Sequence, residues 1–129
     1  MKRILLGSLA VFVAWSVMDI IIHGFLLMPT YIETSSLWRP ENEMKNGLLY
    51  LVTLVAAVGF VWIYSFIKNK SMKMGLVYGL ILGVAWGFSA GFGTYSYTPI
   101  PMTLAISWFA ATVAETVVAG LLVACIVKE

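Results

Sequence analysis

Three ionisable side chains interrupt long apolar stretches of the sequence, at Asp19, His23 and Glu115. Asp19 and His23 are four residues apart, so they share one face if their segment is helical. Two carboxyl groups and an imidazole can bind a divalent cation, relay a proton, or hydrogen-bond one another and so lock neighbouring helices. We predict an ion or proton site in which Asp19 is the anionic ligand or proton acceptor, His23 the pH-sensitive partner and Glu115 the second carboxylate.

A metal ion at this site would depend on these same three residues. The sequence has a single histidine, so the paired-histidine motifs of many metal sites are absent. The sequence requires no cofactor, although it allows a divalent cation. No nucleophile-and-base arrangement is recognisable, so we expect no catalytic residues and no enzyme.

The composition around these residues is that of an integral membrane protein. Of the 129 residues, 61% are hydrophobic and 11% charged, and the mean hydropathy is +0.95. Soluble domains average about 25% charged residues, so both a water-soluble monomer and a disordered chain are excluded. A net charge of +2 is too small to indicate a nucleic-acid partner.

Four apolar runs lie at about 4–28, 47–67, 74–97 and 102–127, each with the roughly 20 residues that a bilayer-spanning helix needs. The sequence therefore predicts one all-α domain over residues 1–129, a four-helix transmembrane bundle. Pro29 is expected to end the first helix, and the loop 29–46 is the main segment outside the membrane. Because only Arg39 and Lys45 of the Lys and Arg residues fall in that loop, the positive-inside rule places both termini in the cytoplasm.

Counting along the helices places Asp19 and Glu115 within roughly 5 Å of each other in depth, in the outer half of the membrane, if the first and last spans are neighbours. We expect a buried site there. Trp38 and Arg39 of the outer loop suit the headgroup level or the recognition of a partner. A supporting belt of polar residues is expected at the depth of the site, formed by Tyr50, Thr53, Ser89, Ser107 and Thr112.

Glycine recurs at every fourth position along the third span. This glycine ladder allows close approach of a second helix. The partner is either a helix of the same chain, at 47–67 or 102–127, or another protein, and a glycine-lined pore is a further alternative. The ladder consists of Gly75, Gly79, Gly83, Gly87 and Gly91.

The segment Trp15-Ser-Val-Met-Asp19-Ile-Ile-Ile-His23, followed by Pro29, Tyr31 and Leu37-Trp38-Arg39-Pro40, resembles small uncharacterised bacterial four-helix inner-membrane proteins of domain-of-unknown-function families. The resemblance implies a multi-pass protein of the bacterial inner membrane and carries no activity. From the residues themselves, we expect a small transport or ion-binding protein. The alternative is an accessory subunit of a larger membrane complex, or a homo-oligomer, that docks through the glycine ladder.

Overall fold

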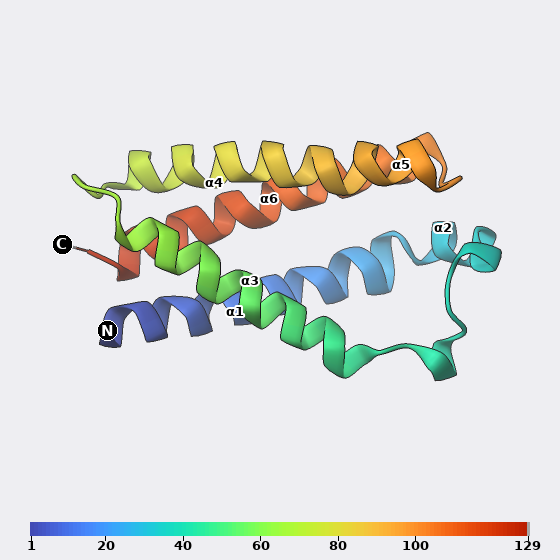
Figure 1. Ribbon diagram of the computed structural model, residues 1–129, viewed down its shortest axis with the longest axis horizontal. Coiled ribbons are helices and arrows are strands. Elements are labelled where there is room, and N and C mark those ends of the chain that lie inside the picture. The colour runs from blue at the N-terminus through green and yellow to red at the C-terminus, as the bar shows by residue number, and fades with distance from the viewer. Residues whose placement is uncertain (129) are drawn as a thin grey trace.

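The computed structural model describes residues 1–128, and every regular element in that range is helical. Four helices are long and apolar enough to cross a membrane, which confirms the all-α four-helix bundle (Figure 1). The chain is thus a multi-pass membrane protein. Its spans are Lys2–Leu26, Asn46–Ser65, Met72–Tyr97 and Met102–Ile126.

The first span changes from an α-helix to a π-helical turn near its end. Helix α1 (Lys2–Ile21) continues into a π-helical turn, η1 (Ile22–Leu26). Beyond Leu27 a short helix, α2 (Met28–Glu33), begins with Pro29 in its first turn, where the missing N–H of proline costs nothing. Pro29 therefore starts a helix, which corrects the expectation that it only ends one. Two 3₁₀ turns, η2 (Ser35–Leu37) and η3 (Glu41–Glu43), follow.

The remaining spans are joined by short connections. Helix α3 (Asn46–Ser65) leads to α4 (Met72–Phe88), whose first turn is capped by Ser71 Oγ accepting from the Met74 N–H at 3.1 Å. The third span contains a second π-helical turn, η4 (Ser89–Gly93), and ends in α5 (Thr94–Tyr97). Helix α6 (Met102–Ile126) begins directly after Pro101, a residue that suits a helix start.

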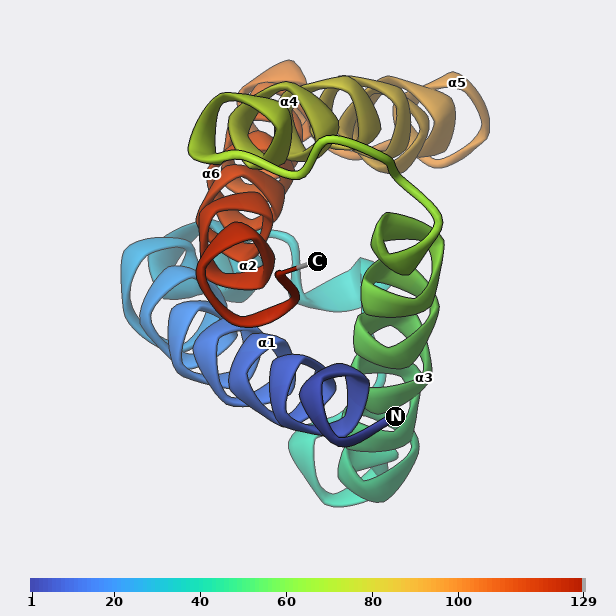
Figure 2. The ribbon, with the colours of Figure 1, turned by 90° about the vertical axis from the view of Figure 1, so that its left-hand side faces the viewer.

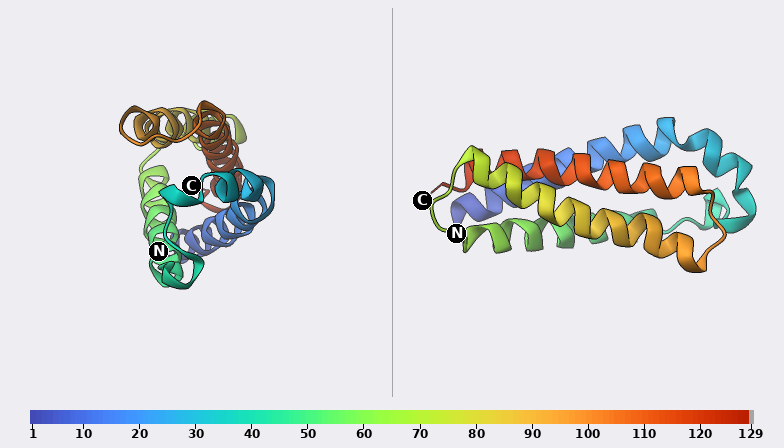
Figure 3. Two further views of the ribbon diagram at one scale, coloured as in Figure 1. Left: turned by 90° about the vertical axis from the view of Figure 1, so that its right-hand side faces the viewer. Right: turned by 90° about the horizontal axis from the view of Figure 1, so that it is seen from above.

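The four spans surround a common axis when the molecule is seen end-on (Figure 2). Helix α6 packs most extensively against α4 and also against α1, while α3 packs mainly against α1. Both termini and the α3–α4 connection lie at one end, called the termini end below. Helix α2, η3 and the α5–α6 connection lie at the other, called the loop end (Figure 3).

Two apolar clusters hold the bundle together. The larger one lies toward the termini end and joins all four spans. Its buried members are Val11, Trp15, Ala57, Phe60, Val61, Tyr64, Tyr78, Ala119, Val123, Ala124 and Val127. A smaller cluster lies at the loop end, where Ile100, Leu104 and Ala105 are packed against by Leu27, Tyr31, Leu37, Trp38, Phe92 and Trp108.

The glycine ladder faces α6 of the same chain along its whole length. A Cβ added at Gly75 would strike the Gly120 carbonyl, one at Gly79 the Thr116 carbonyl, and one at Gly91 the Ala105 carbonyl. Gly83 and Gly87 are likewise covered by α6. The ladder is therefore occupied within the chain, which corrects the hypotheses that it docks another protein or lines a pore.

Candidate ion site

Helices α1 and α6 bring the three predicted site residues to one cavity between the two apolar clusters. The cavity has a volume of about 220 Å³. Asp19 and His23 enter from the first span, Glu115 from α6, and one residue from η4. The lining residues are Asp19, His23, Ala90, Trp108, Ala111, Thr112 and Glu115.

Asp19 and His23 lie side by side on the first span. The Nε2 atom of His23 is 3.7 Å from Oδ1 of Asp19, an ion-pair distance and too long for a direct hydrogen bond. His23 belongs to the π-helical turn η1, and such turns occur frequently at functional sites because the extra residue re-aims the side chains that follow. The local backbone is thus adapted at the point where the imidazole enters the cavity.

Glu115 is tied to α1 through its backbone, and its carboxyl group lies beside that of Asp19. The Trp15 indole N–H donates to the Glu115 main-chain carbonyl at 2.8 Å, which ties α1 to α6 directly beside the cavity. Within residues 1–128, the carboxyl atom Oε1 is shielded from solvent and has no hydrogen-bond partner. The charges of Asp19 and Glu115 act on each other. A buried carboxyl oxygen without a partner is costly, so this atom is poised to take up a proton or a cation.

The cavity is half-open, which corrects the expectation of a buried site. The side chains of Asp19 and His23 each keep 41% of their surface exposed. The loop-end half of α3 does not close the cavity, because all residues of Asn46–Val55 except the partly buried Thr53 are exposed. The site therefore combines one shielded carboxylate with an accessible carboxylate–imidazole pair.

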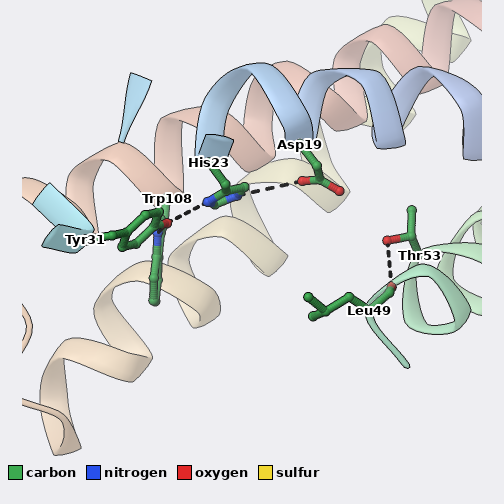
Figure 4. A network of polar contacts seen from close by, with 6 residues as sticks. All are labelled: Asp19, His23, Tyr31, Leu49, Thr53 and Trp108. Atoms are coloured by element: carbon green, nitrogen blue, oxygen red, sulfur yellow. Dashed lines mark hydrogen bonds and ion pairs between the residues drawn. The ribbon is translucent and has the colours of Figure 1, made fainter. Parts of the chain in front are cut away.

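Only Thr112 of the predicted polar belt lines the cavity. Thr53 Oγ1 donates to the Leu49 carbonyl at 3.1 Å within α3 (Figure 4). Ser107 Oγ likewise donates to the Thr103 carbonyl of its own helix at 2.7 Å. Tyr50 and Ser89 are exposed. Although the five belt residues were predicted at the same depth in the membrane, four of them do not face the cavity.

Two aromatic residues that the sequence did not assign to the site complete it. The hydroxyl of Tyr31, on α2, lies 2.6 Å from His23 Nδ1 and accepts the indole N–H of Trp108 at 2.8 Å (Figure 4). Trp108 could have been found, because it lies two helical turns before Glu115 and so shares its face of α6. Tyr31 carries no such signal, since only the turn of the chain between η1 and α2 brings it back to His23.

The two outer-loop residues singled out in the sequence separate in the structure. Trp38 packs edge-on against Tyr31, with ring centroids 5.7 Å apart, and donates its indole N–H to Thr34 Oγ1 at 2.9 Å. Trp38 therefore belongs to the aromatic cover at the loop end of the cavity. Arg39 is exposed.

Metal coordination receives no support from the geometry. Across residues 1–128, no group of three His, Cys, Asp or Glu side chains is arranged to hold a metal ion. Asp19, His23 and Glu115 line one cavity without converging on one point.

No protein-family model, curated protein or solved structure matches the chain. The resemblance to small bacterial inner-membrane proteins stays a prediction, and the function has to be argued from the site itself.

Proposed function

We propose that this protein moves or stores protons at the cavity formed by Asp19, His23 and Glu115, in the inner membrane of a bacterium. The observation that carries the proposal is the unpartnered, solvent-shielded oxygen of Glu115, which shares a cavity with a second carboxylate and an imidazole. The Lys and Arg distribution supports a cytoplasmic termini end and an outward loop end.

The electrostatics of the site favour the uptake of one positive charge. Two carboxylates in one cavity at membrane depth repel each other, and the shielded Glu115 oxygen receives little screening from water. Sharing one proton between Asp19 and Glu115 relieves the repulsion and supplies the Glu115 oxygen with a hydrogen bond. A proton needs no convergent ligand shell, whereas a divalent metal ion needs one, so the observed geometry favours the proton.

A purely structural role for these groups is less well supported. If the polar residues only locked the helices, the Glu115 carboxyl group should have a donor or a base as its partner. Instead, its side-chain partner is the carboxyl group of Asp19, a second acid, and the oxygen Oε1 has no hydrogen-bond partner among residues 1–128. The contact between α1 and α6 is supplied by the Trp15 indole and the backbone of Glu115.

Proton flux into vesicles tests the proposal. The purified protein is reconstituted into liposomes that contain a pH-sensitive dye, and a potassium diffusion potential is imposed. We expect faster acidification than in protein-free vesicles, and the loss of that excess in Asp19→Asn and Glu115→Gln. Glu33→Gln is the matched control, because Glu33 is an exposed carboxylate of α2 outside the cavity.

Two results would overturn the proposal. One is a wild-type flux equal to that of protein-free vesicles. The other is an excess flux that persists in both cavity variants. A current that follows sodium or potassium and is independent of pH, but is lost in the same variants, would replace the proton by a monovalent cation.

A further inference from the structure

Tyr31 connects the cavity to the loop end through two hydrogen bonds that meet at its hydroxyl. Trp108 of α6 approaches the hydroxyl from one side at 2.8 Å, and His23 of η1 from the other at 2.6 Å (Figure 4). The Tyr31 and His23 rings are also stacked, with centroids 5.9 Å apart and planes inclined by 21°. Three separate elements thus converge on one oxygen atom.

The proton count at this oxygen decides the tautomer of the neutral imidazole. An indole nitrogen can only donate, so the Tyr31 oxygen must accept from Trp108. Every group then has a partner only if the single O–H of Tyr31 points at His23 Nδ1, which makes Nδ1 the unprotonated, accepting nitrogen of the neutral ring. The ring proton consequently sits on Nε2, the atom 3.7 Å from Asp19 Oδ1.

We propose that Tyr31 is a positioning residue of the site: held by Trp108, it keeps neutral His23 in the Nε2–H tautomer, so that the ring proton faces Asp19. The relevance of this arrangement to proton movement rests on the proposed function. The tautomer itself does not, because it follows from hydrogen-bond donors and acceptors alone.

Protonation of His23 opposes this arrangement. A second proton on Nδ1 would turn that nitrogen into a donor, and the Tyr31 oxygen would then face two donors while its own O–H turns away. Charging His23 therefore reverses the His23–Tyr31 hydrogen bond that joins η1 to α2 and leaves the Tyr31 O–H to find another acceptor. Burial raises the pKa of the Tyr31 phenol above its ordinary value, so Tyr31 stays uncharged throughout the range in which an imidazole titrates.

The groups that bear on His23 come from three elements. Asp19 of α1 and Glu115 of α6 are the carboxylates of the cavity. Tyr31 of α2 is the third titratable neighbour, and η4 contributes Ala90, which carries no charge. Glu33 of α2 lines a separate hollow beside Gly24 and Phe25.

Nitrogen NMR reads the tautomer directly. His23 is the only histidine in the chain, so [¹⁵N]histidine labelling gives one imidazole without any need for assignment. At a pH where the ring is neutral, we expect the protonated nitrogen to be Nε2. Tyr31→Phe removes the O–H and should shift the ring toward a mixture of tautomers. Trp108→Phe should do so as well, because it frees the Tyr31 oxygen to accept from Nδ1.

Tyr97→Phe is the matched control, since Tyr97 is 79% exposed and lies outside the cavity. A wild-type ring protonated on Nδ1 would overturn the proposal, and so would a Tyr31→Phe spectrum identical to that of the control. The wild-type spectrum alone decides the tautomer if a variant does not fold.

The vesicle assay then separates a positioning role from a merely structural one. For histidines that bind metals, loss of the outer partner that orients the ring commonly costs about tenfold or more in activity, and we take the same scale for this unmetallated ring. We expect Tyr31→Phe to lower the proton flux about tenfold and to change the shape of its pH profile. An equal loss of flux at every pH would argue against positioning. A protein that conducts no protons, but whose tautomer still depends on Tyr31, would refute the proposed function and leave the tautomer assignment intact.

Discussion

The two ends of the bundle differ in how their helices are held. At the termini end, Trp15, Phe60 and Tyr64 are buried in a core that joins all four spans. At the loop end, α3 departs from the other spans, and its residues from Asn46 to Val55 are almost all exposed. The candidate site lies where the packed half gives way to the open half. In this protein the ionisable groups thus occupy the point at which apolar packing stops.

Part of the loop end is nevertheless well packed. Beside the exposed part of α3, the loop end has an apolar cluster of its own in which Tyr31, Trp38 and Trp108 cover the start of α6. The cavity is therefore covered at the loop end by aromatic rings, and toward the termini end the Trp15 indole is hydrogen-bonded to the backbone of its lining residue Glu115. Its free side is the one that α3 leaves open.

The largest effect is expected from the α4–α6 contact, which is shared by both halves. Gly79→Leu would push a side chain into the Thr116 carbonyl and the backbone of Val117. Ordinary overpacking costs about 1–3 kcal/mol when neighbouring side chains can adjust, but the atoms in the way here belong to the backbone of α6. We therefore expect a larger cost than for any single truncation in the core, and loss of the folded state in mild detergent. Unfolding followed by tryptophan fluorescence in a denaturing detergent measures the change.

Gly59→Leu is the control for that substitution. Gly59 also lies in a membrane-spanning helix, yet an added Cβ there has no neighbour within 4 Å. Equal destabilisation by the two substitutions would mean that the ladder is not the tight seam described above.

The next largest effect is expected from truncating a side chain in the buried half of α3, and the same change in its exposed half serves as the comparison. Phe60 is fully buried in the termini half, whereas Leu51 is 53% exposed in the loop half. Phe60→Ala should lower the free energy of unfolding by about 3–5 kcal/mol, the usual cost of removing a core phenylalanine. Leu51→Ala should change it by less than about 0.5 kcal/mol, as measured in the same assay. A large loss at Leu51 would show that the loop half of α3 packs against something in the membrane.

The smallest effect is expected at the boundary between the halves. Trp15→Phe removes the hydrogen bond to the Glu115 carbonyl but keeps an aromatic ring against Phe60. The loss should be about 1 kcal/mol, since the carbonyl retains its helical partner. Hydrogen exchange of amides in α6 near Glu115 provides a local measurement. Unchanged exchange rates in Trp15→Phe would mean that the Trp15–Glu115 hydrogen bond does not hold α1 against α6.

The sequence predicted the spans well because an apolar run of bilayer length leaves few alternatives. The predicted 47–67 and 102–127 became Asn46–Ser65 and Met102–Ile126. It also predicted that Asp19 and Glu115 would be close, because helix rise converts residue number into depth. Depth says nothing about which face a residue occupies, and so four of the five belt residues fell outside the cavity.

The partner of the glycine ladder was predicted only in part. Helix α6 was one of the two intramolecular candidates, but the sequence did not identify which of its small residues would meet the ladder. The observed seam uses Ala105, Thr116 and Gly120. Many stripes of small residues run along an alanine-rich helix, and only three-dimensional packing selects one. The contact of Tyr31 with His23 could not be predicted either. It depends on the direction of the turn between η1 and α2, which local sequence does not determine.

The seam between α4 and α6 also has a mechanical consequence. The backbones of the two helices are in direct contact at Gly75, Gly79 and Gly91, and elsewhere only a few side chains, such as that of Thr116 against Gly83, lie between them. The pair therefore has little room to slide or twist and should move as one rigid unit. Asn69, whose φ of 56° turns the chain sharply between α3 and α4, lies where this rigid pair joins the less extensively packed helix α3.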